Sequence, residues 1–167
     1  MTLRAALLLA GVGLATALPA AASPCRQEIT AAAQRHGVPL AVALTVAKVE
    51  SAHDPLAMNI AGWPARAHSP ADAAIAIRKL RAAGIHSIDV GCMQINLKHH
   101  PKAFARIEDA FDPRANTDYG VRFLKELYQE KQSWGKAIAA YHSSDPARQS
   151  VYLNSIRKHF AANAGGN

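Results

Sequence analysis

A proline that follows a serine or an aspartate opens four stretches of this sequence, and apolar residues recur at helical spacing in each stretch. The first residue of such a pair supplies an N-cap side chain. Proline suits the first helical position because the N–H that it lacks would be unpaired there. The pairs are Ser23-Pro24, Ser69-Pro70, Asp112-Pro113 and Asp145-Pro146. The chain is therefore expected to fold mainly into helices separated by polar turns.

A further helix is predicted to begin at Pro39. It must end before Pro55, because the residue before a proline disfavours helical backbone, so Glu50 and Ser51 fall in its last turn. Residues 85–97 lack a helical period, which favours a loop or a short strand. No other stretch alternates convincingly with period two. The predicted fold class is all-α, or mainly α, with a small irregular or β segment.

The first 22 residues are expected to be a secretory signal peptide. Arg4 precedes an apolar run over residues 5–18, and small alanines follow up to Ala22, a pattern typical of exported proteins. A membrane anchor is the alternative, but the run is shorter than the roughly 20 residues that span a bilayer. The mature protein is thus expected in the periplasm, without stable membrane insertion after signal cleavage. The chain divides into a signal peptide (1–22), one domain (23–161) and a flexible C-terminal tail (162–167).

The sequence is basic, with a formal charge of +7 and a pI near 9.7. An exported basic protein suits an anionic partner such as cell wall, anionic lipid or nucleic acid. The positive residues are scattered, with no denser run than residues 78–81 and few aromatic residues among them. This distribution disfavours nucleic acid as a partner.

The sequence contains two cysteines, Cys25 and Cys92. In an oxidising periplasm such a pair favours a disulfide, which would join the start of the domain to its middle. Two separate buried thiols are the alternative. Neither cysteine lies in a C-x-x-C or H-x-x-x-H spacing, so no metal site is predicted, and no cofactor is expected.

Glu50 is the main candidate for an acid–base catalyst. It is expected at the end of an apolar helix and ahead of a polar loop, where a carboxyl group can be half-buried beside a cleft. Such surroundings disfavour an ionised carboxylate and therefore suit a general acid. On position alone, a solvated glutamate that closes a helix is the simpler interpretation.

Three short motifs, in a set order along the chain, favour the catalytic interpretation over the solvated glutamate. Glu50-Ser51 is followed by Gly-Cys-Met-Gln-Ile-Asn (91–96) and then by Ala-Tyr-His-Ser (140–143). Together they resemble the motifs of the soluble lytic transglycosylase (SLT) domain family, which has a lysozyme-like fold. Residues 116–120 also resemble a helix start of that family. The resemblance covers nearly the whole chain after the leader.

The resemblance implies a role for each matching residue. Glu50 would be the general acid and then the general base, with Ser51 hydrogen-bonded near its carboxyl group or the substrate. Gln94 and Asn96 would bind N-acetyl groups and sugar hydroxyls, although stabilisation of their own loop explains these amides equally well. Met93 would pack under a sugar ring, with a flexible core residue as the alternative.

The third motif adds Tyr141 and His142. Tyr141 would hydrogen-bond Glu50, with a core tyrosine as the alternative. His142 stands where the family usually has asparagine, and it would either hydrogen-bond beside the cleft or make activity depend on pH. Similar Tyr-His-Ser endings occur in the pilus- and secretion-associated branch of the family. The resemblance is closest to that branch, which implies a secretion or pilus machine as a partner beside the peptidoglycan glycan strands.

The implied reaction cleaves the β-1,4 bond between N-acetylmuramic acid (MurNAc) and N-acetylglucosamine (GlcNAc) and forms a 1,6-anhydro-MurNAc end. Most glycosidases need two carboxyl groups, whereas Asp54 is expected in a turn and Asp89 is expected to brace its loop. A goose-type lysozyme-like hydrolase is one alternative, and a non-catalytic wall-binding assembly module is another. Residues 59–88 exceed what the family needs, and their predicted helix (69–83) is expected to shape one cleft wall.

Overall fold

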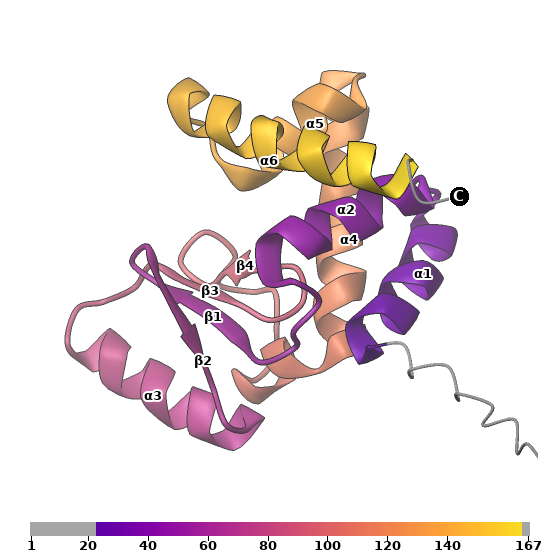
Figure 1. Ribbon diagram of the computed structural model, residues 1–167. Coiled ribbons are helices and arrows are strands. Elements are labelled where there is room, and N and C mark those ends of the chain that lie inside the picture. The colour runs from indigo at the N-terminus through magenta and orange to yellow at the C-terminus, as the bar shows by residue number, and fades with distance from the viewer. Residues whose placement is uncertain (1–22, 165–167) are drawn as a thin grey trace, which may run out of the picture.

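A computed structural model describes residues 23–164, so the expected signal peptide lies outside the described residues. This part of the chain folds into helices and one small sheet (Figure 1). The helices are α1 (Pro24–His36), α2 (Leu40–Ser51), α3 (Pro70–Ala82), the 3₁₀ helix η1 (Glu108–Phe111), α4 (Pro113–Lys131), α5 (Trp134–His142) and α6 (Pro146–Ala164). The strands are β1 (Ala57–Ile60), β2 (Trp63–Arg66), β3 (Ile88–Val90) and β4 (Ile95–Asn96). The predicted mainly α fold class with a small β segment is confirmed.

The predicted helix starts carry the expected caps. The side chains of Ser23, Ser69 and Asp112 each accept a hydrogen bond from the backbone N–H three residues further on. Asp145 accepts one from the N–H two residues further on, at 2.8 Å. Each cap pairs an N–H group that would otherwise be unsatisfied at a helix start. The sequence therefore fixes these four boundaries locally.

Two helix ends, those of α2 and α6, can be compared with the predicted boundaries. Helix α2 ends at Ser51, followed by Ala52 in the left-handed conformation, so Glu50 lies in the last turn as predicted. Helix α6 continues to Ala164. The expected domain end at residue 161 therefore falls inside a helix, and residues 162–164 belong to that helix.

The strands form one antiparallel sheet in the order β2-β1-β3-β4. The hairpin of β1 and β2 was not predicted, because β2 is exposed along its whole length and so has no alternation of apolar and polar residues. Asn59 lies opposite Asp89, which lies opposite Asn96. Directly opposite residues share a face of a sheet. We call Asn59, Asp89 and Asn96 the polar row.

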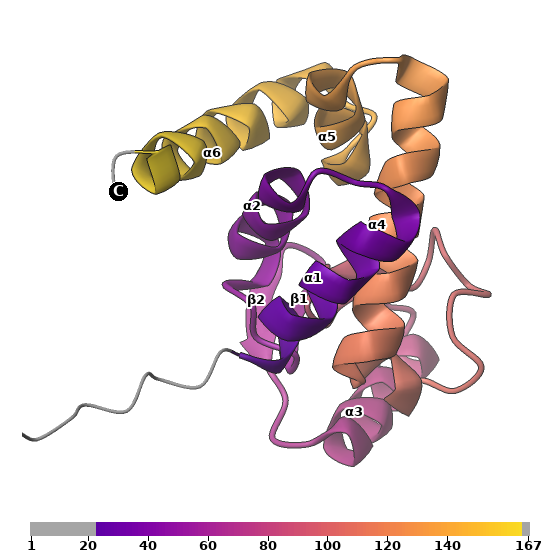
Figure 2. The same cartoon turned by 90° about the vertical axis from the view of Figure 1, so that its right-hand side faces the viewer.

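Two apolar cores meet along residues 90–97. The helical core gathers α1, α2, α4, α5 and α6, and it includes Cys92, Met93 and Ile95. The sheet core lies between the strands, α3 and η1, and it includes Val90 and Leu97. Figures 1 and 2 show α3 at the opposite end of the molecule from α5 and α6. The segment that carries the second motif is therefore packed from both sides.

The predicted disulfide between Cys25 and Cys92 is confirmed, with Cα atoms 5.7 Å apart. It joins α1 to the loop between β3 and β4 across 67 residues of sequence. In the chain-entropy model, closing a loop of this length stabilises the fold by about 4 kcal/mol. Within residues 23–164, no helix is both long enough and apolar enough to cross a membrane.

Candidate functional site

Glu50 is held nearly buried at the end of α2. Its side chain is 12% exposed, and the nearest ring nitrogen of His142, Nδ1, lies 3.8 Å from Oε1. Oε1 is buried and has no hydrogen-bond partner among the described residues. A buried polar atom without a partner is unfavourable for folding. The placement of Oε1 therefore needs an explanation other than its contribution to stability.

Tyr152 on α6 is a member of the site that the sequence did not reveal. Its side chain is 5% exposed, and its ring stacks on that of His142. Burial raises the pKa of Tyr152 well above its usual value, and the adjacent Glu50 carboxylate raises it further. The two side chains approach each other, but neither the Tyr152 hydroxyl nor Glu50 Oε1 has a well-formed hydrogen bond among the described residues.

Tyr152 recurs at helical spacing with Ile156 and Phe160, which indicates an apolar face, and both Tyr152 and Ile156 are buried. The period predicts burial but not what the hydroxyl faces. A tyrosine among apolar positions usually finds a partner for its hydroxyl when it is buried. The need for a hydroxyl partner was therefore the one signal in the sequence that Tyr152 would meet a polar group of another element.

The loop between β3 and β4 is fastened by Ser51 and Tyr141. The Ser51 hydroxyl donates to the Cys92 carbonyl at 2.7 Å, which ties the end of α2 to the loop. The Tyr141 hydroxyl donates to the Met93 carbonyl at 2.8 Å. A phenol has one proton to donate. The predicted hydrogen bond from Tyr141 to Glu50 is therefore wrong, although the charge of Glu50 adds to burial in raising the pKa of Tyr141.

Asn116 on α4 fastens the same loop from the other side. This fully buried side chain accepts from the Met93 backbone N–H at 2.8 Å and donates to the carbonyls of Val90 and Ala110. One helical turn further on, a Cβ at Gly120 would lie 2.5 Å from the Cβ of Met93. The segment 116–120 thus serves close packing of the loop against α4.

The side chains of the loop itself mostly serve the loop. The Gln94 amide donates to the carbonyl of Ala57 and to one within the loop. The Asn96 amide donates to Asp89 at 2.7 Å, and its oxygen accepts from two following backbone N–H groups. Met93 is fully buried in the helical core. For these three residues the contacts fit the structural alternatives, and substrate contact stays a prediction.

Asp89, in the polar row, is a second carboxyl group close to Glu50. Its pKa is raised, chiefly by burial and further by the charge of Glu50, against the opposing hydrogen bond from Asn96. Asp54 is not equivalent: it forms an ion pair with Arg66 at 2.5 Å and accepts from a backbone N–H in its own turn. The site thus gathers Glu50 and Asp89 with side chains of α5 and α6.

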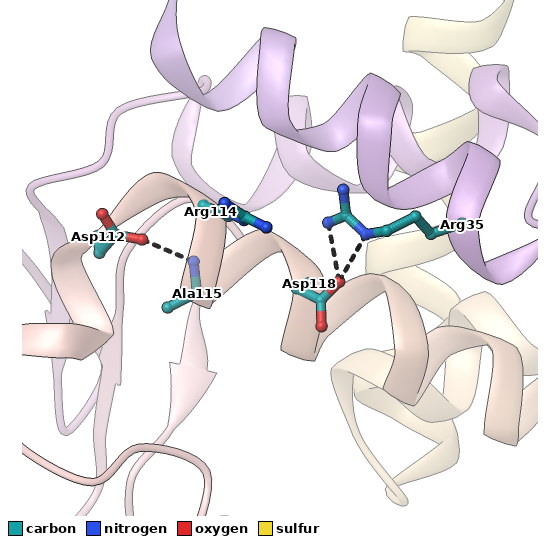
Figure 3. A pocket seen from close by; sticks show the side chains of 5 residues that line it. All are labelled: Arg35, Asp112, Arg114, Ala115 and Asp118. Atoms are coloured by element: carbon teal, nitrogen blue, oxygen red, sulfur yellow. Dashed lines mark hydrogen bonds and ion pairs between the residues drawn. The ribbon is translucent and has the colours of Figure 1, made fainter.

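A separate hollow lies between α1 and α4 (Figure 3). Two arginines and two aspartates line it, and Arg35 donates two hydrogen bonds to Asp118. No residue of the three motifs lines this hollow, so it is not the candidate site. Among the residues that the structure describes, no group of three or more His, Cys, Asp or Glu side chains could hold a metal ion.

The family model described as Transglycosylase SLT domain matches residues 27–159. No curated protein matches the chain, and no solved structure does. The matched range contains the three motifs and Tyr152.

Proposed function

The chain belongs to the transglycosylase SLT domain family, and from this premise we propose that it is a lytic transglycosylase that cleaves the MurNAc–GlcNAc bond of peptidoglycan and leaves 1,6-anhydro-MurNAc ends. The observation that carries the proposal is the buried carboxyl oxygen of Glu50, which lies beside His142 and Tyr152 and has no hydrogen-bond partner in the described part of the chain. We also propose a periplasmic location, because the N-terminal sequence resembles a signal peptide. We further propose that the protein serves a secretion or pilus machine, because its third motif ends in Tyr-His-Ser.

In the proposed reaction Glu50 acts twice. As a general acid it protonates the glycosidic oxygen as the bond from MurNAc C1 to that oxygen breaks. The C6 hydroxyl of the same MurNAc then forms a new bond to C1 and returns its proton to Glu50. The N-acetyl group helps to stabilise the cation-like centre. No water is consumed, and Glu50 ends the cycle as it began.

Tyr152 and His142 are proposed to position Glu50. The Tyr152 hydroxyl is a donor that faces the carboxyl group, and hydrogen bonds to ionised groups are the stronger ones. His142 covers the Tyr152 ring by stacking. A phenol with an ordinary pKa already keeps its proton at neutral pH, and the raised pKa of Tyr152 strengthens that preference, so Tyr152 serves as a donor and not as an acid.

The position of Asp89 favours a second candidate function, that of a hydrolase of the goose-type lysozyme kind. In that reaction a second carboxylate activates a water molecule while Glu50 protonates the leaving oxygen. Asp89 lies close enough for the charge of Glu50 to raise its pKa. Its hydrogen bond from Asn96 holds one of its oxygens in the polar row, which counts against a free role as base.

Mass spectrometry of the products from purified sacculi tests both candidates. The proposed function predicts muropeptides with anhydro ends from the wild type and none from Glu50→Gln. Reducing ends in place of anhydro ends would establish the hydrolase instead. Sacculi left uncut by a folded wild type would refute both reactions.

A further inference from the structure

A hollow at one end of the sheet is lined by basic side chains from three separate segments. Arg81 comes from the last turn of α3, His86 from the connection to β3, and Lys98 from the segment after β4, two residues past its end. Leu97 and Pro101 complete the lining. We call Arg81, His86 and Lys98 the cationic shelf.

The charge of the cationic shelf is not neutralised within the described part of the protein. The ion pairs there involve neither Arg81 nor Lys98, whereas Arg78 on the same helix pairs with Glu108 at 3.4 Å. The hollow of Figure 3 differs, because its two arginines are matched by two aspartates. The shelf is thus the hollow with an unmatched positive charge.

The shelf adjoins the polar row. His86 is three residues before Asp89, and Lys98 is two residues after Asn96, its partner across the sheet. At about 3.3 Å per residue, the shelf begins within roughly 10 Å of this pair. The Asn96 side chain accepts from the Lys98 backbone N–H at 3.0 Å, which fixes the start of the segment. The shelf is therefore linked to the surroundings of Glu50 through Asp89, whose pKa the charge of Glu50 raises.

We propose that the cationic shelf binds the carboxylates of the stem peptides that hang from the glycan strand. The proposal rests on the proposed function, since it takes peptidoglycan as the substrate. Stem peptides bring free carboxylates beside the MurNAc residue whose bond is cleaved. A guanidinium and an ammonium that have no partner among residues 23–160 are suited to such groups. Helix α3 lies in the long segment between the first two motifs. It thus contributes to a subsite that binds the peptide and not the sugar.

The test compares Arg81→Ala/Lys98→Ala with Arg114→Ala/Lys158→Ala, which removes an equal charge away from the shelf. Binding is measured in the Glu50→Gln background, by pelleting with intact sacculi and by equilibrium dialysis with the soluble glycan strands that an amidase strips of peptide. The shelf variant should bind intact sacculi roughly 5- to 20-fold more weakly than its parent and stripped strands equally well. For the control variant, any change in binding relative to its parent should be the same for intact sacculi and for stripped strands. Arg81→Gln/Lys98→Gln, which retains bulk, should reproduce the shelf variant.

Because pelleting does not need cleavage, the two proposals fail separately. Peptide-dependent binding through Arg81 and Lys98 supports the shelf even if the wild type releases no anhydro product. Equal weakening on both substrates, the same selective weakening in the control pair, or no weakening at all would overturn the shelf and leave the proposed reaction standing.

Discussion

The imidazole ring of His142 lies flat against the phenol ring of Tyr152, with centroids 4.2 Å apart and planes within 2° of parallel. The rings come from α5 and α6, and both side chains face Glu50 at the end of α2. The position of the acid therefore depends on how the last two helices pack against α2.

Tyr152→Phe should slow release of anhydro-muropeptides by about 10- to 100-fold, because a hydrogen bond from its hydroxyl to the carboxylate that forms as Glu50 gives up its proton would be worth about 1.5–3 kcal/mol. The loss should fall on kcat and not on binding to sacculi. The melting temperature should not fall, since the hydroxyl has no well-formed hydrogen bond to lose. Tyr128→Phe, whose ring stacks on Trp134, is the control. Wild-type turnover by Tyr152→Phe would remove Tyr152 from the site.

Glu50→Gln should abolish cleavage while the fold and wall binding remain. Glutamine has nearly the shape of glutamate but can neither give nor take the proton, and general acid–base assistance is worth about 10²–10⁴-fold. The measurements are product release, melting curves and pelleting with sacculi. Glu130→Gln, at an exposed ion pair with Lys131, is the matched control. Near wild-type release by Glu50→Gln would assign the chemistry to another residue.

Asn116→Ala should lower the free energy of unfolding by about 3–5 kcal/mol, because three buried backbone groups lose their partner at once. Urea unfolding measures this change. The exposed Asn154→Ala, which loses one hydrogen bond to Arg157, should change stability by less than about 1 kcal/mol. A similar small loss for both variants would show that water replaces the Asn116 amide.

Asp89→Asn should stabilise the protein at neutral pH. The pKa of Asp89 is raised in the fold, chiefly by burial, so the folded state holds this proton more tightly than the unfolded chain. The wild type therefore loses stability as pH rises above the usual Asp pKa. Asparagine keeps an acceptor for Asn96 and has no such loss. The melting temperature of Asp89→Asn should exceed that of the wild type at pH 7 and match it near pH 3, roughly where the carboxyl is protonated in both states.

The opposite sign is expected at Asp109, whose pKa is lowered by the hydrogen bond from Arg106. Asp109→Asn should therefore be no more stable than the wild type at pH 7. An Asp89→Asn advantage that is independent of pH would contradict the linkage argument, because it would have to come from packing.

Much of this fold was predictable because its signals are local. A capping serine or aspartate before proline acts within one turn, so it set the starts of α1, α3, α4 and α6. The partner of the Tyr141 hydroxyl was not predictable, since it depends on how closely α4 approaches the loop at Gly120. Tyr152 was missed for the same reason: helical period shows which face is buried but not which polar atom of another helix it meets.

The loop that carries Met93 is anchored to elements on both sides of it in the sequence. The Cys25 anchor in α1 precedes the loop, whereas Asn116 follows Met93 by 23 residues. A fragment that ends before α4 contains Glu50, Cys25 and Cys92 but lacks Asn116, His142 and Tyr152. The proposed site is therefore complete only when the C-terminal helices pack over α2.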